Sequence, residues 1–385
     1  MLSNRSLVQA VLFPDFAPED ARTLPVIGEQ KDIAYHSAPA KSVLNGPEVT
    51  GMGYWSVNPY VGCAFGCAYC YARYAHRYVM ERAAAKETLD DTLVRDFANI
   101  PPWLAFERHV FVKENAATLL RKALRHGGTR HRALIEGESI VIGTATDPYQ
   151  PAERRYRVTR QILEVLCEHA DLSVVVITKS PLVTRDIDLL SRLNRNSRVS
   201  IHLTLTTLDR ELARRIEPRA PTPEARIRAL GRLREAGIDA GINVMPVLPG
   251  ITDNPSALEA LVERVAAVGA TYVNACALRL QSEARKRYLP FIDQEFPHLS
   301  ERYRNTYAHD HNAGERYRDG LAKFFDKMCR KYKVRGFVYD PSKDGDEERE
   351  SVADAIAEHV EPAPVIQQLA LDLDAAGIDV TEGNR

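Results

Sequence analysis

Short runs of β-branched residues alternate with longer amphipathic stretches from about residue 57 to residue 280. Because this alternation is typical of βα units, it predicts a parallel sheet whose strands are joined by helices. Six core strands are predicted, over residues 57–61, 139–144, 173–178, 198–206, 240–247 and 271–278. Six such units form an open doubly wound sheet or an incomplete barrel, and in both the functional site lies where the strands end.

The segments between the predicted strands have helical patterns. Residues 151–170 begin with proline and carry apolar residues at helical spacing, and residues 223–236 end at Gly237, a common helix stop. The apolar run at residues 109–113 is a further candidate strand, before a helix over residues 116–124. The chain therefore has the helices that a parallel sheet needs between its strands.

The two ends of the chain differ from this central part. Residues 1–50 are rich in proline and polar residues and show no sustained period, which indicates an extended N-terminal arm without catalytic residues. Residues 281–385 are strongly charged, with a helical pattern to about residue 333 and then many Pro, Glu and Asp residues. This indicates a helical C-terminal extension and a mobile tail around a core of residues 51–280.

Composition and charge limit the partners. With 51 Lys plus Arg and 52 Asp plus Glu, the net charge is -1, so no overall field draws the chain to nucleic acid or membranes. Basic stretches leave nucleic acid open as a partner, but no groove-reading motif supports it. No apolar run approaches the roughly 18 to 20 residues that span a bilayer. The N-terminus shows no signal-peptide pattern, so we expect a cytoplasmic protein without a membrane partner.

Three of the six cysteines, Cys63, Cys67 and Cys70, lie within eight positions directly after the first predicted strand. Chance gives this spacing roughly once in a thousand chains of such composition. Thiolates so placed reach three iron atoms on one face of a cubane cluster, and Gly62 and Gly66 let the backbone approach its sulfides. Three protein ligands leave the fourth iron open for another molecule.

Zinc is the alternative metal. A structural zinc site normally has four protein ligands in two separated pairs, and the chain has no second CxxC pair, although His76 is available as a fourth ligand. Buried apolar cysteines without any metal are the other alternative. Of the remaining cysteines, Cys276 on the sixth predicted strand either packs in the core or donates a hydrogen atom.

The segment Cys63-Ala-Phe-Gly-Cys67-Ala-Tyr69-Cys70 resembles the CX3CX2C signature of radical S-adenosylmethionine (SAM) enzymes. The flanking residues, 40–45 and 58–73, are similar to those of the spore photoproduct lyase-like or "DNA repair photolyase" branch, and the resemblance extends over about residues 34–280. It implies the fold of that superfamily, an α/β partial (β/α)6 TIM-like barrel, which has six strands as predicted here.

The resemblance also implies the cofactors. Cys63, Cys67 and Cys70 would hold a 4Fe-4S cluster, and the amino and carboxylate groups of SAM would chelate its fourth iron. One electron, from a donor such as flavodoxin or ferredoxin, would cleave SAM to methionine and a 5'-deoxyadenosyl radical that abstracts hydrogen from the substrate. The protein would contribute positioning and the exclusion of water.

Four further residues are implied to bind SAM. Tyr69 would lie near the adenine, and Lys179, at the end of the third predicted strand, would reach the carboxylate. Thr204, near the end of the fourth strand, would offer a hydroxyl. Asp147 follows the second strand, where many members carry a GGE stretch that this chain lacks. It is either a polar partner for SAM or a helix cap.

The resemblance stops at the hydrogen donor. Thr144 stands where spore photoproduct lyase has the cysteine that quenches its product radical, so spore photoproduct repair is not expected. The substrate is then a nucleic-acid base, a peptide or a small metabolite, and no catalytic residue is assigned. The alternative class is an iron–sulfur or zinc protein that binds nucleic acid without turnover.

Overall fold

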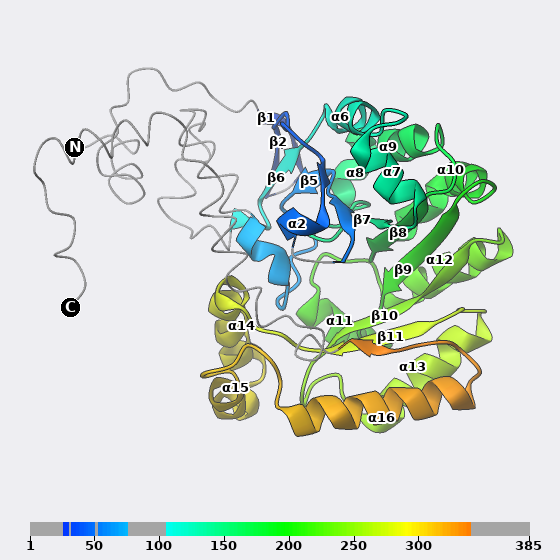
Figure 1. Ribbon diagram of the computed structural model, residues 1–385. Coiled ribbons are helices and arrows are strands. Elements are labelled where there is room, and N and C mark those ends of the chain that lie inside the picture. The colour runs from blue at the N-terminus through cyan, green and yellow to red at the C-terminus, as the bar shows by residue number, and fades with distance from the viewer. Residues whose placement is uncertain (1–25, 31, 51–52, 76–104, 340–385) are drawn as a thin grey trace, which may run out of the picture. The chain divides into compact units, whose positions relative to one another are not determined.

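The computed structural model describes residues 26–30, 32–50, 53–75 and 105–339 (Figure 1). Its main feature is an eight-stranded sheet with the strand order β12-β11-β10-β9-β8-β7-β4-β3. All neighbours in this sheet pair in parallel except β3 and β4. In chain order the strands are β3 (Leu44–Asn45), β4 (Trp55–Val57), β7 (Ser139–Ile142), β8 (Ser173–Thr178), β9 (Arg198–Thr204), β10 (Asp239–Val247), β11 (Val273–Ala277) and β12 (Val338–Tyr339).

The predicted core strands correspond to β4 and β7 to β11, which lie next to one another. They form the expected partial (β/α)6 barrel. β3 and β12 are the two edges of the sheet, so the barrel is open. The register places four fully buried residues side by side across neighbouring strands, and they belong to the hydrophobic core: Val57, Ile142, Val176 and Ile201.

The first predicted strand, residues 57–61, is divided between two sheets. β4 ends at Val57, and β5 (Tyr60–Val61) pairs with β6 (His109–Val112) in a second sheet of order β1-β2-β6-β5. The break falls at Asn58 and Pro59, because proline has no N–H for a strand ladder. The side chain of Asn58 instead accepts a hydrogen bond from the Ala145 N–H at 2.8 Å. The candidate strand at residues 109–113 is confirmed as β6.

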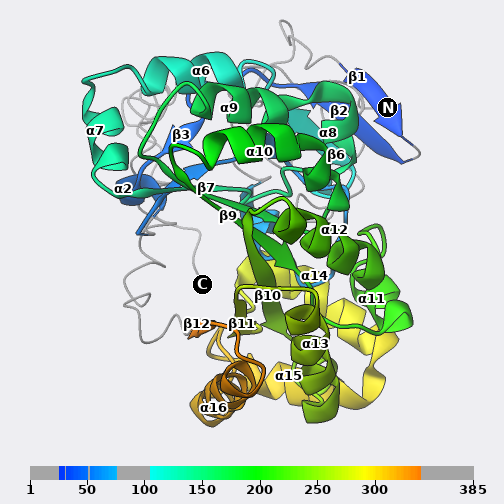
Figure 2. The same cartoon turned by 90° about the vertical axis from the view of Figure 1, so that its right-hand side faces the viewer.

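Helices cover one face of the large sheet, as Figure 2 shows. The predicted helix over residues 151–170 is two helices, because Arg157 between them has a left-handed φ of 52°. The helix that begins at Pro223 is confirmed, and the Thr222 hydroxyl accepts the N–H of Ala225 at its start. The helical elements are α6 (Ala116–Ala123), α7 (Thr129–Ile135), α8 (Pro151–Tyr156), α9 (Val158–Leu166), η2 (Pro181–Asp186), α10 (Ile187–Leu193), α11 (Arg210–Ile216), α12 (Pro223–Glu235) and α13 (Pro255–Ala267).

The N-terminal segment contains strands rather than an irregular arm. Residues 26–50 form β1 (Val26–Gln30) and β2 (Ile33–Ser37) of the second sheet, the edge strand β3, and the short helix α2 (Pro47–Thr50). All five residues of β2 are buried, and β2 pairs in parallel with β6. Because β6 lies more than 70 residues further along the chain, the local sequence pattern does not predict this pairing. The expected arm over residues 1–25 lies outside the described residues.

The chain after the last core strand is helical, as expected. It forms α14 (Ser282–Glu295), η3 (Pro297–Leu299), α15 (Ser300–Thr306) and α16 (Glu315–Lys331). α16 packs against β11 and β12, and α14 packs against η1 (Tyr71–Arg73), the turn that ends the cysteine segment. The expected tail over residues 340–385 lies outside the described residues. Within the described ranges, no helix is long and apolar enough to cross a membrane.

Candidate functional site

The cysteine loop, residues 62–70, begins directly after β5 and turns sharply at two glycines. Gly62 has a φ of 84° and Gly66 a φ of 65°, both in the left-handed region that favours glycine. A Cβ atom at Gly62 would lie only 2.5 Å from the carbonyl oxygen of His109. A side chain at Gly62 is therefore excluded by both conformation and space, which explains why glycine precedes the first cysteine.

Side chains that follow β7 hold the start of the loop. The Thr146 hydroxyl and the Gln150 amide donate hydrogen bonds to the Gly62 carbonyl, at 2.7 and 3.1 Å. The Gln150 amide oxygen also accepts the N–H of Ala64 at 2.9 Å. Both side chains are buried, so these bonds are protected from water. The loop is thereby fixed to the carboxyl end of β7, where a functional site is expected.

Backbone groups from two other segments hold the rest of the loop. The Cys63 N–H donates to the Phe106 carbonyl at 3.0 Å, and the Ala68 N–H donates to the Ile216 carbonyl at 2.9 Å. Ile216 ends α11, which follows β9. The loop's buried polar groups therefore find partners within the protein, as buried backbone groups require.

A cluster of arginines around Glu107 supports the loop from behind. Arg73, whose side chain is fully buried, donates to the Cys67 carbonyl at 2.7 Å and pairs with Glu107 at 2.5 Å. Arg219 donates to the Ala64 carbonyl at 2.7 Å and pairs with Glu107 at 3.0 Å. Arg287 of α14 lies 3.4 Å from the same carboxylate, so the C-terminal extension contributes to this support.

The three thiols have no disulfide partners. Cys63 and Cys67 are buried and Cys70 is half-buried. Burial raises the pKa of the Cys63 thiol to about 12 and that of Cys67 well above its ordinary value. Such thiols stay protonated until a metal ion replaces the proton, and a coordinating thiol is deprotonated outright. Three soft donors on one short loop fit an iron–sulfur cluster.

Beside Cys67 lies a buried network around Glu217. The Tyr69 hydroxyl donates to one carboxylate oxygen of Glu217, and Arg226 forms an ion pair with the other. The Thr206 hydroxyl donates to Glu217 at 3.4 Å. Burial raises the pKa of Glu217, but the charges of Arg226 and Lys179 and the hydrogen bonds from Arg226 and Tyr69 together outweigh it and hold the pKa below its ordinary value. Tyr69 is thus fixed in orientation, two residues from Cys67.

Lys179 lies over the ring of Tyr69, with its Nζ atom 5.5 Å from the ring centroid. Burial lowers the pKa of Lys179, but the nearby Cys67, in its thiolate form, and Glu217 outweigh this effect, so its pKa is raised and it stays a cation. The structure therefore brings a fixed positive charge to the cysteine loop, at the end of β8. This is where the sequence predicts a partner for the SAM carboxylate.

Asp147 is fully engaged with its own chain. Its carboxylate accepts hydrogen bonds from the Thr178 hydroxyl at 2.6 Å, from the Lys179 N–H at 2.7 Å and from the Tyr149 N–H at 2.9 Å. The last bond closes a turn before α8 but does not cap that helix, because Gln150 is the N-cap residue of α8. The other two hydrogen bonds connect the segment after β7 to Thr178 and Lys179 at the end of β8.

Thr204 ends β9, and its side chain is buried. The carbonyl of Thr204 accepts a hydrogen bond from Arg226 at 3.0 Å, and Arg226 pairs with Glu217. Thr204 is thereby linked through two residues to Tyr69. The cysteines, Tyr69 and Lys179 thus lie together, while Thr204 and Asp147 adjoin them through shared hydrogen-bond partners. His76, the alternative zinc ligand, lies outside the described residues.

Several residues of this site carry no signal in the sequence. Glu107 stands in no recognisable motif and supports the loop through Arg73. Gln150 lies in the segment after the second predicted strand, but no role is predicted for it there. Glu217 and Arg219 belong to a Glu-Pro-Arg sequence that suggests an ion pair between them. In the structure they pair elsewhere, Glu217 with Arg226 and Arg219 with Glu107. For Arg73, the signal in the sequence is its position just after the cysteine motif.

A comparison with protein families identifies the class. The model of the Radical SAM superfamily matches residues 57–262, which is more than half of the chain. The matched region runs from the last residue of β4 into α13 and includes the cysteine loop. The chain therefore belongs to the radical SAM superfamily, and it is a radical SAM enzyme, as the cysteine motif indicates.

Two relatives are similar over most of their lengths. The uncharacterized protein Rv2578c of Mycobacterium tuberculosis (strain ATCC 25618 / H37Rv) is 33% identical over 306 residues, 79% of this chain and 82% of that protein. The uncharacterized protein MJ0683 of Methanocaldococcus jannaschii is 28% identical over 270 residues, 70% of this chain and 86% of that protein. The chain thus matches these relatives as whole proteins rather than through a shared fragment.

Among solved structures, the fold is similar to that of spore photoproduct lyase. A mutant of that enzyme with bound AdoMet and dinucleoside spore photoproduct gives a TM-score of 0.56 at 13% identity, covering 83% of this chain and 87% of that one. The complex with dinucleoside spore photoproduct gives a TM-score of 0.54 at 13% identity with the same coverage. The expected architecture is therefore confirmed, because the likeness extends beyond the core to most of both chains.

Proposed function

We propose that Cys63, Cys67 and Cys70 bind a 4Fe-4S cluster and that SAM binds beside it, against Lys179. When bound, this pair of cofactors supplies a one-electron cleavage of SAM to methionine and a 5'-deoxyadenosyl radical that abstracts hydrogen from the substrate. A reduced flavodoxin or ferredoxin is the proposed electron donor. The observation that carries the proposal is the juxtaposition of three free thiols with a half-buried lysine at the strand ends.

The chain's own residues position SAM in this proposal. Lys179 attracts the SAM carboxylate, since its raised pKa keeps it charged. Tyr69, fixed by Glu217, presents its ring toward the adenine, and Thr204 offers its hydroxyl from the end of β9. Asp147 acts through Lys179, because two of its three hydrogen bonds hold residues 178 and 179. The four SAM residues are thereby assigned different tasks.

The substrate differs, in this proposal, from a spore photoproduct. Thr144 occupies the place of the hydrogen-donating cysteine, and an O–H bond is too strong to replace a thiol in quenching a carbon radical. Thr144 is also engaged, because the Asn58 amide donates to its hydroxyl at 3.0 Å and the Tyr71 hydroxyl donates to its carbonyl. These contacts support a structural role for Thr144 in place of radical quenching.

The proposal is tested by anaerobic reconstitution with iron and sulfide, followed by iron counting and an assay for 5'-deoxyadenosine after addition of SAM and dithionite. About four irons per chain are expected, with 5'-deoxyadenosine formed. Both should be lost in Cys67→Ala. The matched control is Cys167→Ala. Cys167 is also a free cysteine and is half-buried, but it lies at the end of α9 and outside the cysteine loop.

Two outcomes contradict the proposal. Zinc in place of iron, or a cluster that leaves SAM intact in the presence of reductant, would favour the alternative of a metal protein that binds nucleic acid without turnover. Equal loss of iron in Cys67→Ala and Cys167→Ala would show that the loss reports misfolding rather than ligand removal.

A further inference from the structure

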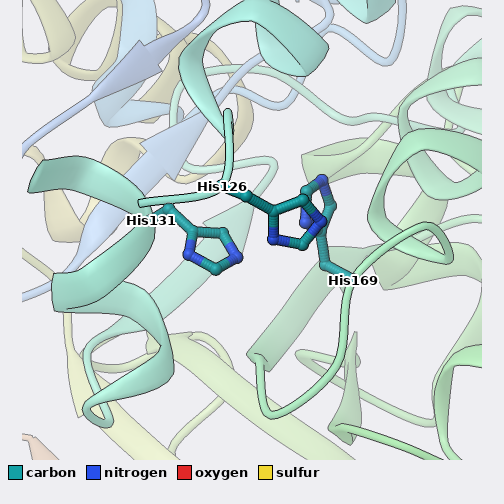
Figure 3. A group of neighbouring side chains, drawn as sticks. All are labelled: His126, His131 and His169. Carbon is teal, nitrogen blue, oxygen red and sulfur yellow. The ribbon is translucent and has the colours of Figure 1, made fainter. Parts of the chain in front are cut away.

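Three histidines converge beside the amino ends of two core strands, and Figure 3 shows their side chains. His126 lies between α6 and α7, His131 lies in α7, and His169 lies between α9 and β8. α7 precedes β7 and His169 precedes β8, so the cluster adjoins the amino ends of these strands. The cysteine loop is held by residues that follow strand ends, so the two sites are separate.

The geometry of the cluster is close to that of a metal site. The nearest ring nitrogens of the three histidines all lie within 4.8 Å of one another. The ring centroids are 4.8, 5.2 and 5.4 Å apart, and the planes are inclined by 51° to 68°, so the rings are not stacked. Zinc bonds of about 2.0 to 2.1 Å in a tetrahedral site bring ligand nitrogens to roughly 3.3 Å. Small side-chain rotations would close this difference.

The polar surroundings leave these nitrogens available. His169 Nδ1 is buried and has no hydrogen-bond partner among the described residues. A buried nitrogen without a partner is costly, and a bound ion would remove that cost. The adjacent Glu168 does not compete for the site, because its carboxylate accepts two hydrogen bonds from Arg121, at 2.7 and 3.0 Å.

The protonation state of His169 also suits a metal ion. Metal ions bind neutral imidazole, so a histidine that titrates below its ordinary range is a better ligand at neutral pH. Burial and the neighbouring rings of His131 and His126 lower the pKa of His169. This direction agrees with the close approach of the three rings.

We propose that His126, His131 and His169 bind a Zn²⁺ ion, with the fourth position open to water at the exposed His126. Imidazole ligands suit zinc and its late transition-metal neighbours, and three protein ligands with one open position are typical of sites that accept a water molecule or another small ligand. The ion would connect the α6–α7 turn to the segment after α9. This site is independent of the proposed 4Fe-4S cluster.

The proposal is tested by titrating the full-length chain with zinc chloride and measuring bound metal and the thermal unfolding midpoint. Because cysteine thiolates are also zinc ligands, the titration is repeated with Cys63, Cys67 and Cys70 all replaced by serine. One zinc per chain is expected to remain in that variant, and its binding should raise the unfolding midpoint.

Variants of the histidines separate the site from adventitious binding. His126 is exposed, so His126→Ala should fold normally and weaken zinc binding at least about tenfold. His131→Ala should have the same effect, while His298→Ala, an exposed histidine in η3, should bind zinc as the unaltered chain does. Unchanged zinc affinity in both His126→Ala and His131→Ala, or no zinc bound at one per chain in the serine variant, would overturn the proposal.

Discussion

Replacing Arg226 alone by methionine would leave the Glu217 carboxylate buried without its main counter-ion. The side chains of Arg226 and Glu217 are 1% and 0% exposed, so water cannot take the place of the guanidinium group. The same replacement also removes hydrogen bonds to the Thr204 carbonyl at 3.0 Å and to the Pro221 carbonyl at 2.9 Å. Arg226→Met should therefore destabilise the chain strongly.

The expected loss follows from what a buried charge costs. Removing one partner of a buried pair typically costs about 3 to 5 kcal/mol, because the remaining charge is uncompensated. Lys179 lies close enough to lower the pKa of Glu217 further, and its charge compensates part of the loss. We therefore expect a fall of about 3 kcal/mol, the lower end of that range, in the free energy of unfolding.

Urea unfolding of the full-length chain, followed by circular dichroism, measures this loss. The matched control is Arg330→Met, because Arg330 pairs with Asp326 on α16 where the two side chains are 79% and 57% exposed. An exposed pair contributes about 0 to 1 kcal/mol, so this control should be nearly neutral. The double variant Glu217→Gln with Arg226→Met should recover part of the stability, since it buries no charge.

Two results would contradict the expected role of the buried Glu217–Arg226 pair. An equal loss in Arg226→Met and Arg330→Met would mean that burial does not determine the effect. A double variant that is as unstable as the sum of its two single variants would mean that Glu217 and Arg226 are not energetically coupled.

Gly62→Ala should destabilise the chain in thermal unfolding, because the added Cβ would lie 2.5 Å from a carbonyl oxygen, whereas Gly231→Ala in the open middle of α12 should stabilise it by about 0.5 to 1 kcal/mol. Burial lowers the pKa of His202 from 6.5 to about 4. The unfolded chain therefore binds a proton that the folded chain does not between these values, so stability should fall as the pH drops from about 6.5 to about 4, and less steeply in His202→Gln. Lys179→Met should weaken SAM binding about 10-fold to 100-fold in equilibrium dialysis without loss of iron.

Each of these expectations has a contrary result. Equal changes in the unfolding midpoint of Gly62→Ala and Gly231→Ala would show that the close contact between residue 62 and the His109 carbonyl does not affect stability. A pH profile that His202→Gln leaves unchanged would assign the slope to other groups. Unaltered SAM affinity in Lys179→Met would place Lys179 outside the SAM site.

The core of the fold is predictable from local pattern because each parallel strand is an apolar run followed by an amphipathic helix. That pattern locates β7 to β11 and the helix of Pro223. It fails at residues 57–61, which are predicted as one strand although the chain passes from one sheet to the other at Asn58 and Pro59. It also fails at β2, whose burial depends on pairing with β6, a partner that sequence position does not reveal.

The candidate site divides in the same way. The cysteines are predictable because their spacing relates directly to chemistry. Lys179 is predicted because the family resemblance implies a lysine at the end of the third predicted strand. Glu107 and Gln150 are not, because Gln150 holds backbone groups of the loop and Glu107 holds the arginines behind it, and any distant segment can supply such contacts. Supporting residues of this kind are defined by the folded structure rather than by local sequence.

The anchoring of the cysteine loop has a consequence for how the proposed cluster would be assembled. Hydrogen bonds from the protein hold the loop: Gln150 at one end, Arg73 at the other, and backbone partners between them. A loop held in this way would receive the proposed cluster without having to fold around it. Chemical reconstitution of the folded chain would then need no unfolding step.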